Sequence, residues 1–187
     1  MTVAYSSVVD ADEHIALVMG VIDPDEPTLV RVHSQCTTGD IFGSLRCDCG
    51  DQLRGSLRLF AEQGGGVLLY MSQEGRDIGL ANKLRAYALQ GEGLDTVDAD
   101  QVLGFGSDER VYGAAVQMLK TLNITRVELL TNNPNKIDAV RSAGIEVVHR
   151  RPLYGTLNRH NRAYVKAKIE RSGHWLSDML ADALSEK

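Results

Sequence analysis

The pattern of apolar and polar positions predicts two strands near the N-terminus. Residues 15–22 form an apolar run that ends at a proline-containing turn, and residues 28–34 alternate between apolar and polar side chains. A continuous apolar run is typical of a buried strand, whereas alternation is typical of a half-buried one. Because only a short turn separates the two strands, we expect them to pair antiparallel. The residues before position 15 show no pattern that predicts an element.

Helical and strand patterns alternate through the middle of the chain. After the last cysteine, apolar residues recur at helical spacing until the glycines at 64–66 end the helix. Residues 67–71 are a continuous apolar run, which predicts a short central strand. Residues 72–80 predict a polar, glycine-containing loop, residues 78–90 a second helix, and residues 95–100 an acidic connector.

The C-terminal half predicts a further helix, a βαβ-like unit and a last helix. Ser107 or Asp108 is expected to cap the further helix at its N-terminus. Residues 126–130 and 145–148 predict strands with a helix between them, and Asn161 is expected to start the last helix. Since strands and helices alternate, the fold class is α/β, or α+β with one mixed sheet flanked by helices.

The turn at residues 131–136 has a clear physical interpretation. Asn133 is a suitable N-cap, and Pro134 fits the first helical position, where its missing N–H is not needed. A strand that ends at a helix N-terminus, with Thr131 and Lys136 beside it, could bind an anion such as phosphate. A well-capped turn without a ligand is the alternative.

Length, charge and hydropathy limit the classes of protein that fit. With 187 residues, 43% of them hydrophobic, we expect a single domain over residues 1–187, with a loosely held tail at about 177–187. The net charge of −5 argues against a nucleic-acid partner. No apolar run is long enough to span a membrane, and a basic signal-peptide segment is absent. Together with the few cysteines, this predicts a cytoplasmic protein.

Three cysteines, the only ones in the chain, are the first candidate for chemistry. Cys47 and Cys49 form a C-x-C pair whose Cα atoms, in an extended chain, lie roughly 6.6 Å apart on one side, at the edge of the disulfide range. With Cys36 brought back by the loop, three sulfurs suit Zn²⁺, and three protein ligands with an open position are typical of a catalytic zinc. A structural zinc closed by His33, or three buried free thiols, are the alternatives.

Further motifs lie on both sides of the cysteines. They are Arg-Val-His-Ser-Gln-Cys-Thr-Thr-Gly-Asp at 31–40, Arg-Cys-Asp-Cys with Gln-Leu at 46–53, Gln-Glu-Gly-Arg with Ile-Gly-Leu at 73–80, Lys-x-Arg-Ala-Tyr-Ala-Leu-Gln at 83–90, Asp-Thr-Val at 95–97, Leu-Gly-Phe with Asp-x-Arg at 103–110, and Leu-Thr-Asn-Asn-Pro-x-Lys at 130–136. In order and spacing, from about His14 to Leu176, they resemble the GTP cyclohydrolase II family, which opens GTP in the first committed step of riboflavin biosynthesis.

The resemblance implies a cofactor and a set of site residues. It implies one Zn²⁺ per subunit, held by Cys36, Cys47 and Cys49, and Mg²⁺ on the triphosphate. It implies that GTP is bound by Arg31, Val32, His33, Ser34, Gln35, Gln52, Glu74, Gly75, Arg76, Thr96, Thr131 and Lys136. The implied protein is a homodimeric hydrolase acting on cyclic amidines, with a GTP cyclohydrolase II-like fold.

The resemblance also implies catalytic roles. Asp108 matches the family's proton acceptor, Arg110 its nucleophile at the α-phosphate, and Tyr87 a position used in the hydrolysis that follows ring opening. The implied products are formate, pyrophosphate and 2,5-diamino-6-ribosylamino-4(3H)-pyrimidinone 5′-phosphate. Because an arginine nucleophile needs a neutral guanidinium, which the high pKa of arginine opposes, positioning the phosphate is the simpler role for Arg110.

The chain departs from the family's usual pattern at a few positions. Gln35 stands where Glu is usual, and an amide both donates and accepts where a carboxylate only accepts, so we hypothesise an altered purine choice. Asp98 and Asp100 replace the usual Glu and Asn, and the segment before His14 is shortened. The alternatives are therefore a paralogue with another purine nucleotide as substrate, an enzyme that stops at the formamide, or a non-catalytic zinc nucleotide-binding protein.

Overall fold

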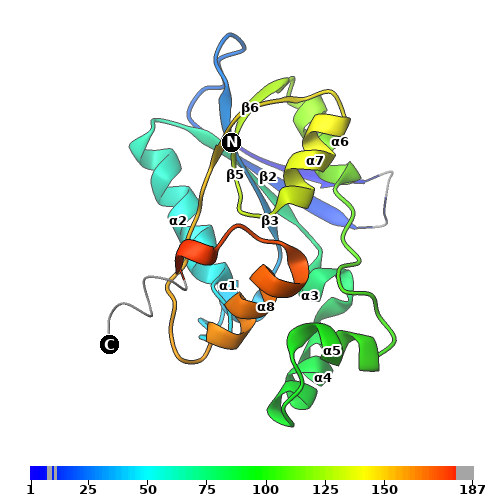
Figure 1. The fold of residues 1–187 in the computed structure, drawn as a ribbon. Helices are drawn as coiled ribbons and strands as arrows, with labels where there is room; N and C mark the ends of the chain where they lie inside the picture. The colour runs from blue at the N-terminus through cyan, green and yellow to red at the C-terminus, as the bar shows by residue number, and fades with distance from the viewer. Residues whose placement is uncertain (8–9, 11, 180–187) are drawn as a thin grey trace. The chain divides into compact units, whose positions relative to one another are not determined.

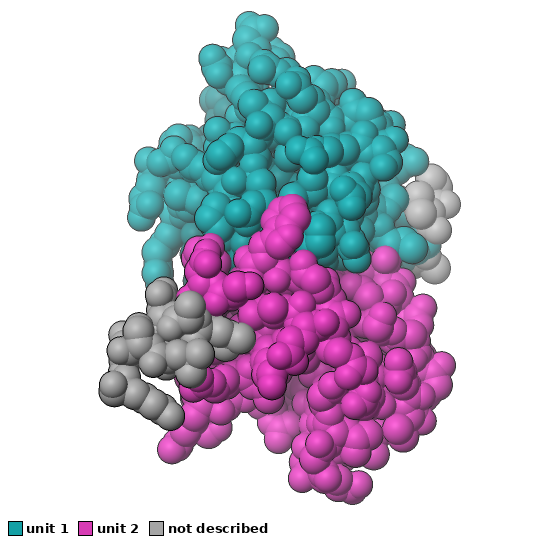
Figure 2. Space-filling view, viewed as in Figure 1, with its two compact units in different colours: residues 1–34, 53–72, 111–153 teal, residues 35–52, 73–110, 154–187 magenta. Residues whose placement is uncertain are grey.

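The computed structural model describes residues 1–7, 10 and 12–179 (Figure 1). The chain divides into two compact units built from interleaved segments (Figure 2). Unit 1 comprises Met1–Ser34, Leu53–Ser72 and Val111–Leu153, and unit 2 comprises Gln35–Gln52, Gln73–Arg110 and the chain from Tyr154 onward. A single domain over residues 1–187 stays a prediction, and most of the predicted loose tail at 177–187 lies outside the described residues.

Unit 1 is built on a mixed sheet, as predicted. Within the described residues the sheet has six strands in the order β1-β2-β4-β3-β5-β6. The strands from β4 to β6 in this order run parallel, and β1 and β2 are antiparallel to their neighbours. The bounds are β1 Thr2–Ser6, β2 Glu13–Met19, β3 Thr28–Ser34, β4 Gly66–Met71, β5 Arg126–Leu130 and β6 Glu146–Arg151.

The expected antiparallel pair of the first two predicted strands is wrong. β4 lies between β2 and β3, antiparallel to the first and parallel to the second. β4 is apolar and buried along nearly its whole length, so it takes a central place with a neighbour on each side. For the same reason β3 is buried on both faces rather than half-buried, including its polar residues Arg31 and His33. β1, which the sequence did not predict, is a half-exposed edge strand on β2.

Helices cover the two faces of this sheet. On one face α6 (Gly113–Thr121) and α7 (Pro134–Ser142) share a core with Val30, Val32 and Leu69. On the other face α2 (Cys49–Glu62) packs Phe60 against Leu68 and further leucines. α7 starts as predicted, since the Asn133 side chain accepts a hydrogen bond from the Asn135 amide (2.9 Å) and Pro134 follows the cap.

Unit 2 is helical, and two of its segments differ from the prediction. Its helices are α1 (Thr37–Asp40), α3 (Glu74–Asp77), α4 (Gly79–Gly91), α5 (Thr96–Val102) and α8 (Arg162–Ser172). The expected acidic connector is α5, because Asp95 caps it by accepting from the amides of Val97 and Asp98. The expected loop at 72–80 contains the short helix α3. α8 follows Asn161, as predicted.

The expected cap of α6 is also wrong. α6 begins at Gly113, after Tyr112, and no side chain caps it. The Asp108 carboxylate instead accepts hydrogen bonds from Arg110, which holds the segment before α6 in a turn. Of the helices that the structure describes, none has the length and apolar character that crossing a membrane requires.

Candidate functional site

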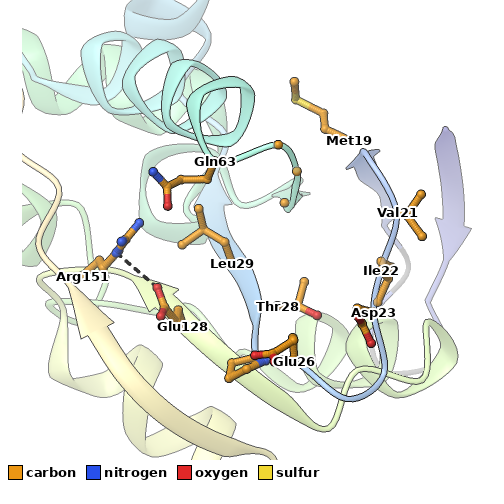
Figure 3. A pocket seen from close by; sticks show the side chains of 14 residues that line it. Met19, Val21, Ile22, Asp23, Glu26, Thr28, Leu29, Gln63, Glu128 and Arg151 are labelled. Atoms are coloured by element: carbon orange, nitrogen blue, oxygen red, sulfur yellow. Dashed lines mark ion pairs between the residues drawn. The ribbon is translucent and has the colours of Figure 1, made fainter.

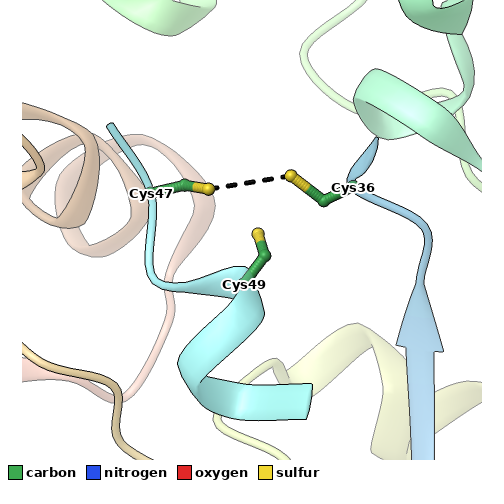
Figure 4. Close-up of side chains that lie close together, drawn as sticks. All are labelled: Cys36, Cys47 and Cys49. Carbon is green, nitrogen blue, oxygen red and sulfur yellow. Dashed lines mark hydrogen bonds between the residues drawn. The ribbon is translucent and has the colours of Figure 1, made fainter. Parts of the chain in front are cut away.

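The three cysteines converge in unit 2 (Figure 4). Cys36 follows the end of β3, Cys47 lies in the next loop, and Cys49 is the first residue of α2. The sulfurs of Cys36 and Cys47 are 3.6 Å apart, and all three sulfurs lie within 4.8 Å of one another. Two thiolates on one tetrahedral zinc are separated by about 3.8 Å, because each Zn–S bond is about 2.3 Å long. The spacing therefore fits one shared metal ion, and the cysteines are not disulfide-bonded.

A glycine makes room for this arrangement. Gly39, in α1, lies so close to the sulfurs that a Cβ placed on it would be 2.8 Å from Cys47 Sγ and 3.2 Å from Cys36 Sγ. Any larger residue would push the sulfurs or α1 away. Among the described residues of unit 2, no fourth cysteine, histidine or carboxylate joins the cluster. The cluster thus offers three protein ligands.

The charges around the sulfurs favour a cation. The thiols of Cys47 and Cys49, together with the nearby Lys83 ammonium, hold the pKa of Cys36 well below its usual range. The hydrogen bond to the resulting thiolate, with burial, raises the pKa of Cys47 to about 11, and the pKa of Cys49 rises for the same reasons. The Cys36 thiol therefore ionises readily. The thiols of Cys47 and Cys49 lose their protons only when a positive charge takes the place of those protons, and a bound divalent metal would supply that charge.

A buried ion pair fixes the short segment between two of these cysteines. The Asp48 side chain is fully buried and accepts hydrogen bonds from Lys168 Nζ (2.7 Å) and Gln52 Nε2 (2.6 Å). Burial alone would raise the pKa of Asp48, but the charge and hydrogen bond of Lys168, together with the hydrogen bond from Gln52 and one from the backbone, lower this pKa. Lys168 also lies 4.5 Å from the centre of the Tyr164 ring, whose hydroxyl is 3.9 Å from Cys49 Sγ. α8 thus braces the segment from Cys47 to Cys49.

Tyr87 lies near the sulfurs, and its catalytic role stays a prediction. Its hydroxyl is 3.4 Å from Thr38 Oγ1, which is in turn 3.7 Å from Cys36 Sγ. Burial raises the pKa of Tyr87, so the phenol is protonated at neutral pH. The structure therefore places an O–H group next to Thr38, whose hydroxyl in turn lies next to the Cys36 sulfur.

Asp108 and Arg110 are engaged with each other. Arg110 donates from Nε to Asp108 Oδ1 (2.7 Å) and from Nη2 to Asp108 Oδ2 (2.5 Å). Burial would raise the pKa of Asp108, but the hydrogen bonds and charge of Arg110 lower it. Arg76 lies close to the same turn, 3.4 Å from Asp100 Oδ2 and 3.1 Å from the carbonyl oxygen of Ser107. Two arginines are thus held by carboxylates in this part of unit 2.

Unit 1 gathers the other expected nucleotide-binding residues at the carboxyl ends of its strands. Arg31 Nη1 donates to the carbonyl of Leu130 (2.9 Å), and Lys136 Nζ donates to the carbonyl of Val32 (2.8 Å). Thr131 Oγ1 accepts from the Asn133 amide (3.0 Å). This end of parallel strands, at a helix N-terminus, is where α/β sheets bind ligands. Ser34 ends β3, and His33 stacks on Tyr70 at a centroid distance of 5.5 Å.

Gln35 and Thr96, two expected substrate-binding residues of unit 2, do not contact the Asp108–Arg110 or Arg76–Asp100 pairs in the contacts described. Gln35 Nε2 donates to Thr37 Oγ1 (3.2 Å). Thr96 is the first residue of α5 and lines a cavity of about 250 Å³ together with Arg46, His160 and Tyr164. None of the three cysteines lines this cavity, but the hydroxyl of Tyr164, which does, lies 3.9 Å from Cys49 Sγ. A second cavity, of about 270 Å³ in unit 1, is lined by none of the expected site residues (Figure 3).

Sequence reasoning missed three residues around the cysteines. Lys83 lies one helical turn before Tyr87 on α4, a spacing that puts both on one face, and this signal could have found it. Lys168 and Tyr164 come from α8, and no spacing or motif connects them with the cysteines.

Comparison with known proteins agrees with these features. The model of the GTP cyclohydrolase II family matches residues 1–152. The riboflavin biosynthesis protein RibBA of Bacillus cytotoxicus is 52% identical over 175 residues, which are 94% of this chain and 44% of the relative. RibBA of Bacillus cereus is 53% identical with the same coverage, and GTP cyclohydrolase-2 of Azospirillum brasilense is 52% identical over 91% of the chain and 44% of its own length. The chain thus spans less than half the length of these relatives. Because the family model matches most of its length, the chain belongs to the GTP cyclohydrolase II family.

Proposed function

We propose that this protein opens the imidazole ring of GTP by hydrolysis in riboflavin biosynthesis. The products would be formate, pyrophosphate and 2,5-diamino-6-ribosylamino-4(3H)-pyrimidinone 5′-phosphate. The observation that carries the proposal is the convergence of three sulfurs, at a spacing that fits one zinc ion, in a chain of this family. The relatives' names, GTP cyclohydrolase-2 and riboflavin biosynthesis protein, agree with it.

Zinc at Cys36, Cys47 and Cys49 is the cofactor that the donor set favours, because thiolates are soft ligands and tetrahedral zinc accepts them. When bound, zinc would supply Lewis acidity and an activated water for attack at C8 of the purine. A cluster of three protein ligands supports an open fourth position.

Tyr87 is proposed to act as a proton donor beside the metal site. Its hydroxyl is protonated at neutral pH, because burial raises its pKa, and Thr38 holds it near Cys36. A group in this state can give a proton to the nitrogen that leaves the formyl carbon when the ring-opened formamide is hydrolysed. This role fits the step after ring opening that the resemblance implies.

Arg110 is proposed to position the phosphate rather than to attack it. A nucleophilic guanidinium must lose its charge, but two hydrogen bonds to Asp108 favour the charged form. Asp108, whose pKa is lowered by the same contact, is a weak base and a good anchor for Arg110. We therefore place Asp108 and Arg110 in the site as a pair, with the arginine facing phosphate charge.

The nucleotide is proposed to be bound by Arg31, Val32, His33, Ser34, Gln35, Gln52, Gly75, Arg76, Thr96, Thr131 and Lys136, with Mg²⁺ on the triphosphate. Arginine and lysine at the strand ends suit a triphosphate, whose charge they offset. Glu74 was expected in this set, and its contacts support a different role, which is argued below. We also propose that the protein is a homodimer.

The test is product analysis. The zinc-loaded protein is incubated with GTP and Mg²⁺, products are identified by mass spectrometry, and formate and pyrophosphate are counted. We expect one formate and one pyrophosphate per GTP consumed, and no turnover by Cys47→Ser. A product that keeps the formyl carbon would favour the enzyme that stops at the formamide. Absence of any product would leave a nucleotide-binding protein and refute the proposal.

A further inference from the structure

A buried ion pair outside the expected ligand set touches the metal cluster. Lys83 Nζ lies 3.1 Å from Cys36 Sγ and 2.6 Å from Glu74 Oε1. The side chains of Lys83 and Glu74 are 10% and 8% exposed. An ammonium at hydrogen-bond distance from a sulfur, and held there by a carboxylate, is the arrangement of a partner that tunes a metal ligand.

Glu74 uses both oxygens to hold the Cys36 segment. Oε2 accepts a hydrogen bond from the Thr37 amide (2.6 Å), which directly follows Cys36. Oε1 accepts from Lys83 and also from the Gly75 amide (3.1 Å). One carboxylate thus fixes the backbone beside the ligand and the lysine against its sulfur. These contacts differ from the nucleotide-binding role that the family resemblance implies for Glu74.

The local backbone is shaped for this contact. Gly75 has a left-handed φ of 64°, which turns the chain between Glu74 and the start of α4. A Cβ on Gly75 would be 3.0 Å from Lys83 Cβ, so only glycine lets the lysine stem pass this closely. The turn therefore brings Glu74 and Lys83 to Cys36 from the same side.

We propose that Lys83, held by Glu74, is a positioning residue of the metal site that donates a hydrogen bond to the Cys36 thiolate and weakens its electron donation to the metal. The proposal rests on zinc binding at the three cysteines in the proposed function. Three thiolates donate strongly and leave a zinc complex with a net charge of about −1, which makes its water less acidic than in a three-histidine site. A donor on one sulfur restores part of that Lewis acidity. The Lys83 ammonium contacts the Cys36 sulfur directly, and the Glu74 carboxylate contacts the ammonium. The ion pair therefore presents its positive end to the sulfur.

Cobalt substitution tests this, because Co²⁺ reports thiolate donation through its sulfur-to-metal charge-transfer band. Co²⁺ and Zn²⁺ affinities are measured by chelator competition for the wild type, Lys83→Met and Lys83→Arg. The double variant Lys83→Met/Glu74→Gln removes the charge pair as a whole, so that no buried carboxylate is left unpaired. Arg85→Met is the matched control. Arg85 is an exposed residue of the same helix, and its side chain donates a hydrogen bond to Asn82 rather than to the cysteine cluster.

The two readouts separate the two effects of Lys83. Loss of the contact that positions the Cys36 sulfur should make Lys83→Met and the double variant bind metal about 10–100-fold more weakly, the size of effect typical of residues that support a metal ligand, whereas the stronger donation of the released thiolate is read from the charge-transfer band. Their charge-transfer band should move to longer wavelength, Lys83→Arg should restore part of both, and Arg85→Met should match the wild type. An unchanged band and affinity in Lys83→Met would overturn the proposal. A wild type that binds no metal would instead overturn the zinc site of the proposed function, so the two failures are distinguished.

Discussion

Removing the Lys168 charge is the sharpest test of how the segment from Cys47 to Cys49 is held. Lys168→Met keeps the length of the side chain and leaves the Asp48 carboxylate, which is fully buried, without its cation. Gln52 still donates one hydrogen bond to Asp48, so one of its two side-chain partners remains. The carboxylate between Cys47 and Cys49 must then be buried as a poorly compensated charge.

Removing one partner of a buried ion pair destabilises a protein by about 3–5 kcal/mol. Because Gln52 remains, we expect the lower end, about 3 kcal/mol, which lowers the folded-to-unfolded ratio by roughly 100-fold. For a chain of this length, it lowers the melting temperature by about 6–12 °C. The lost contact with the Tyr164 ring adds to this effect.

The assay is thermal and urea unfolding in the presence of a chelator, so that metal binding does not contribute. Lys166→Met is the control on the same helix, because Lys166 forms an exposed ion pair with Glu170 at 3.7 Å, and such pairs contribute only about 0.3–0.5 kcal/mol. Lys168→Met/Asp48→Asn should recover much of the loss, since it removes the buried charge as well. The reasoning is refuted if Lys168→Met unfolds like Lys166→Met.

Three further changes follow from the structure. Gly39→Ala should weaken metal binding about 10-fold or more, because the added Cβ would lie 2.8 Å from Cys47 Sγ. Gly55→Ala is the control, since its added Cβ would make only an ordinary contact, and it should leave metal binding unchanged. Burial raises the pKa of Asp100 to about 6 against the opposing charge of Arg76, so the folded state binds the Asp100 proton more tightly than the unfolded state does. As pH rises from the ordinary aspartate range to about 6, the free energy of unfolding of the wild type should therefore fall relative to that of Asp100→Asn, as measured by thermal unfolding. Gln35→Glu should change the ratio of GTP to XTP turnover, and an identical ratio would dismiss a role of Gln35 in purine choice.

The fold was predictable where local patterns were strong. The strands β3 and β5 and the helix α7 have the predicted starts, because alternation, apolar runs and the Asn133 cap are local signals. The central place of β4 was also predictable from its apolar run. Strand order was not predictable, because which strands flank β4 depends on the whole sheet, and β4 separates β2 from β3. α5 was missed because its acidic composition hid a helix whose start is capped by Asp95.

The convergence of the three cysteines was predictable, but not the residues that surround them. The cysteines lie close in sequence, and a C-x-C pair with a third cysteine brought back by a loop favours a shared metal without settling it. Lys83 is 47 residues from Cys36, and Lys168 is 120 residues from Asp48. Contacts over such separations are decided by packing, and a buried lysine resembles a surface lysine in sequence. The quoted motifs end at residue 136, so they could not indicate the contacts of α8.

The two buried lysine pairs around the sulfurs have different physical consequences, and this makes them separable. Lys168 bonds to Asp48, not to a sulfur, so the pair fixes the backbone between Cys47 and Cys49, and its charge acts on Cys49 only through space. Lys83 bonds to a sulfur itself, so its charge acts on the metal through that ligand. Lys168→Met should therefore lower stability and metal affinity together with only a small shift of the cobalt charge-transfer band, whereas Lys83→Met/Glu74→Gln should shift the band more, with a smaller loss of stability. If both variants shift the band equally, the lysines act through a common loosening of the cluster, and the distinction between geometry and electrostatics drawn from these contacts is wrong.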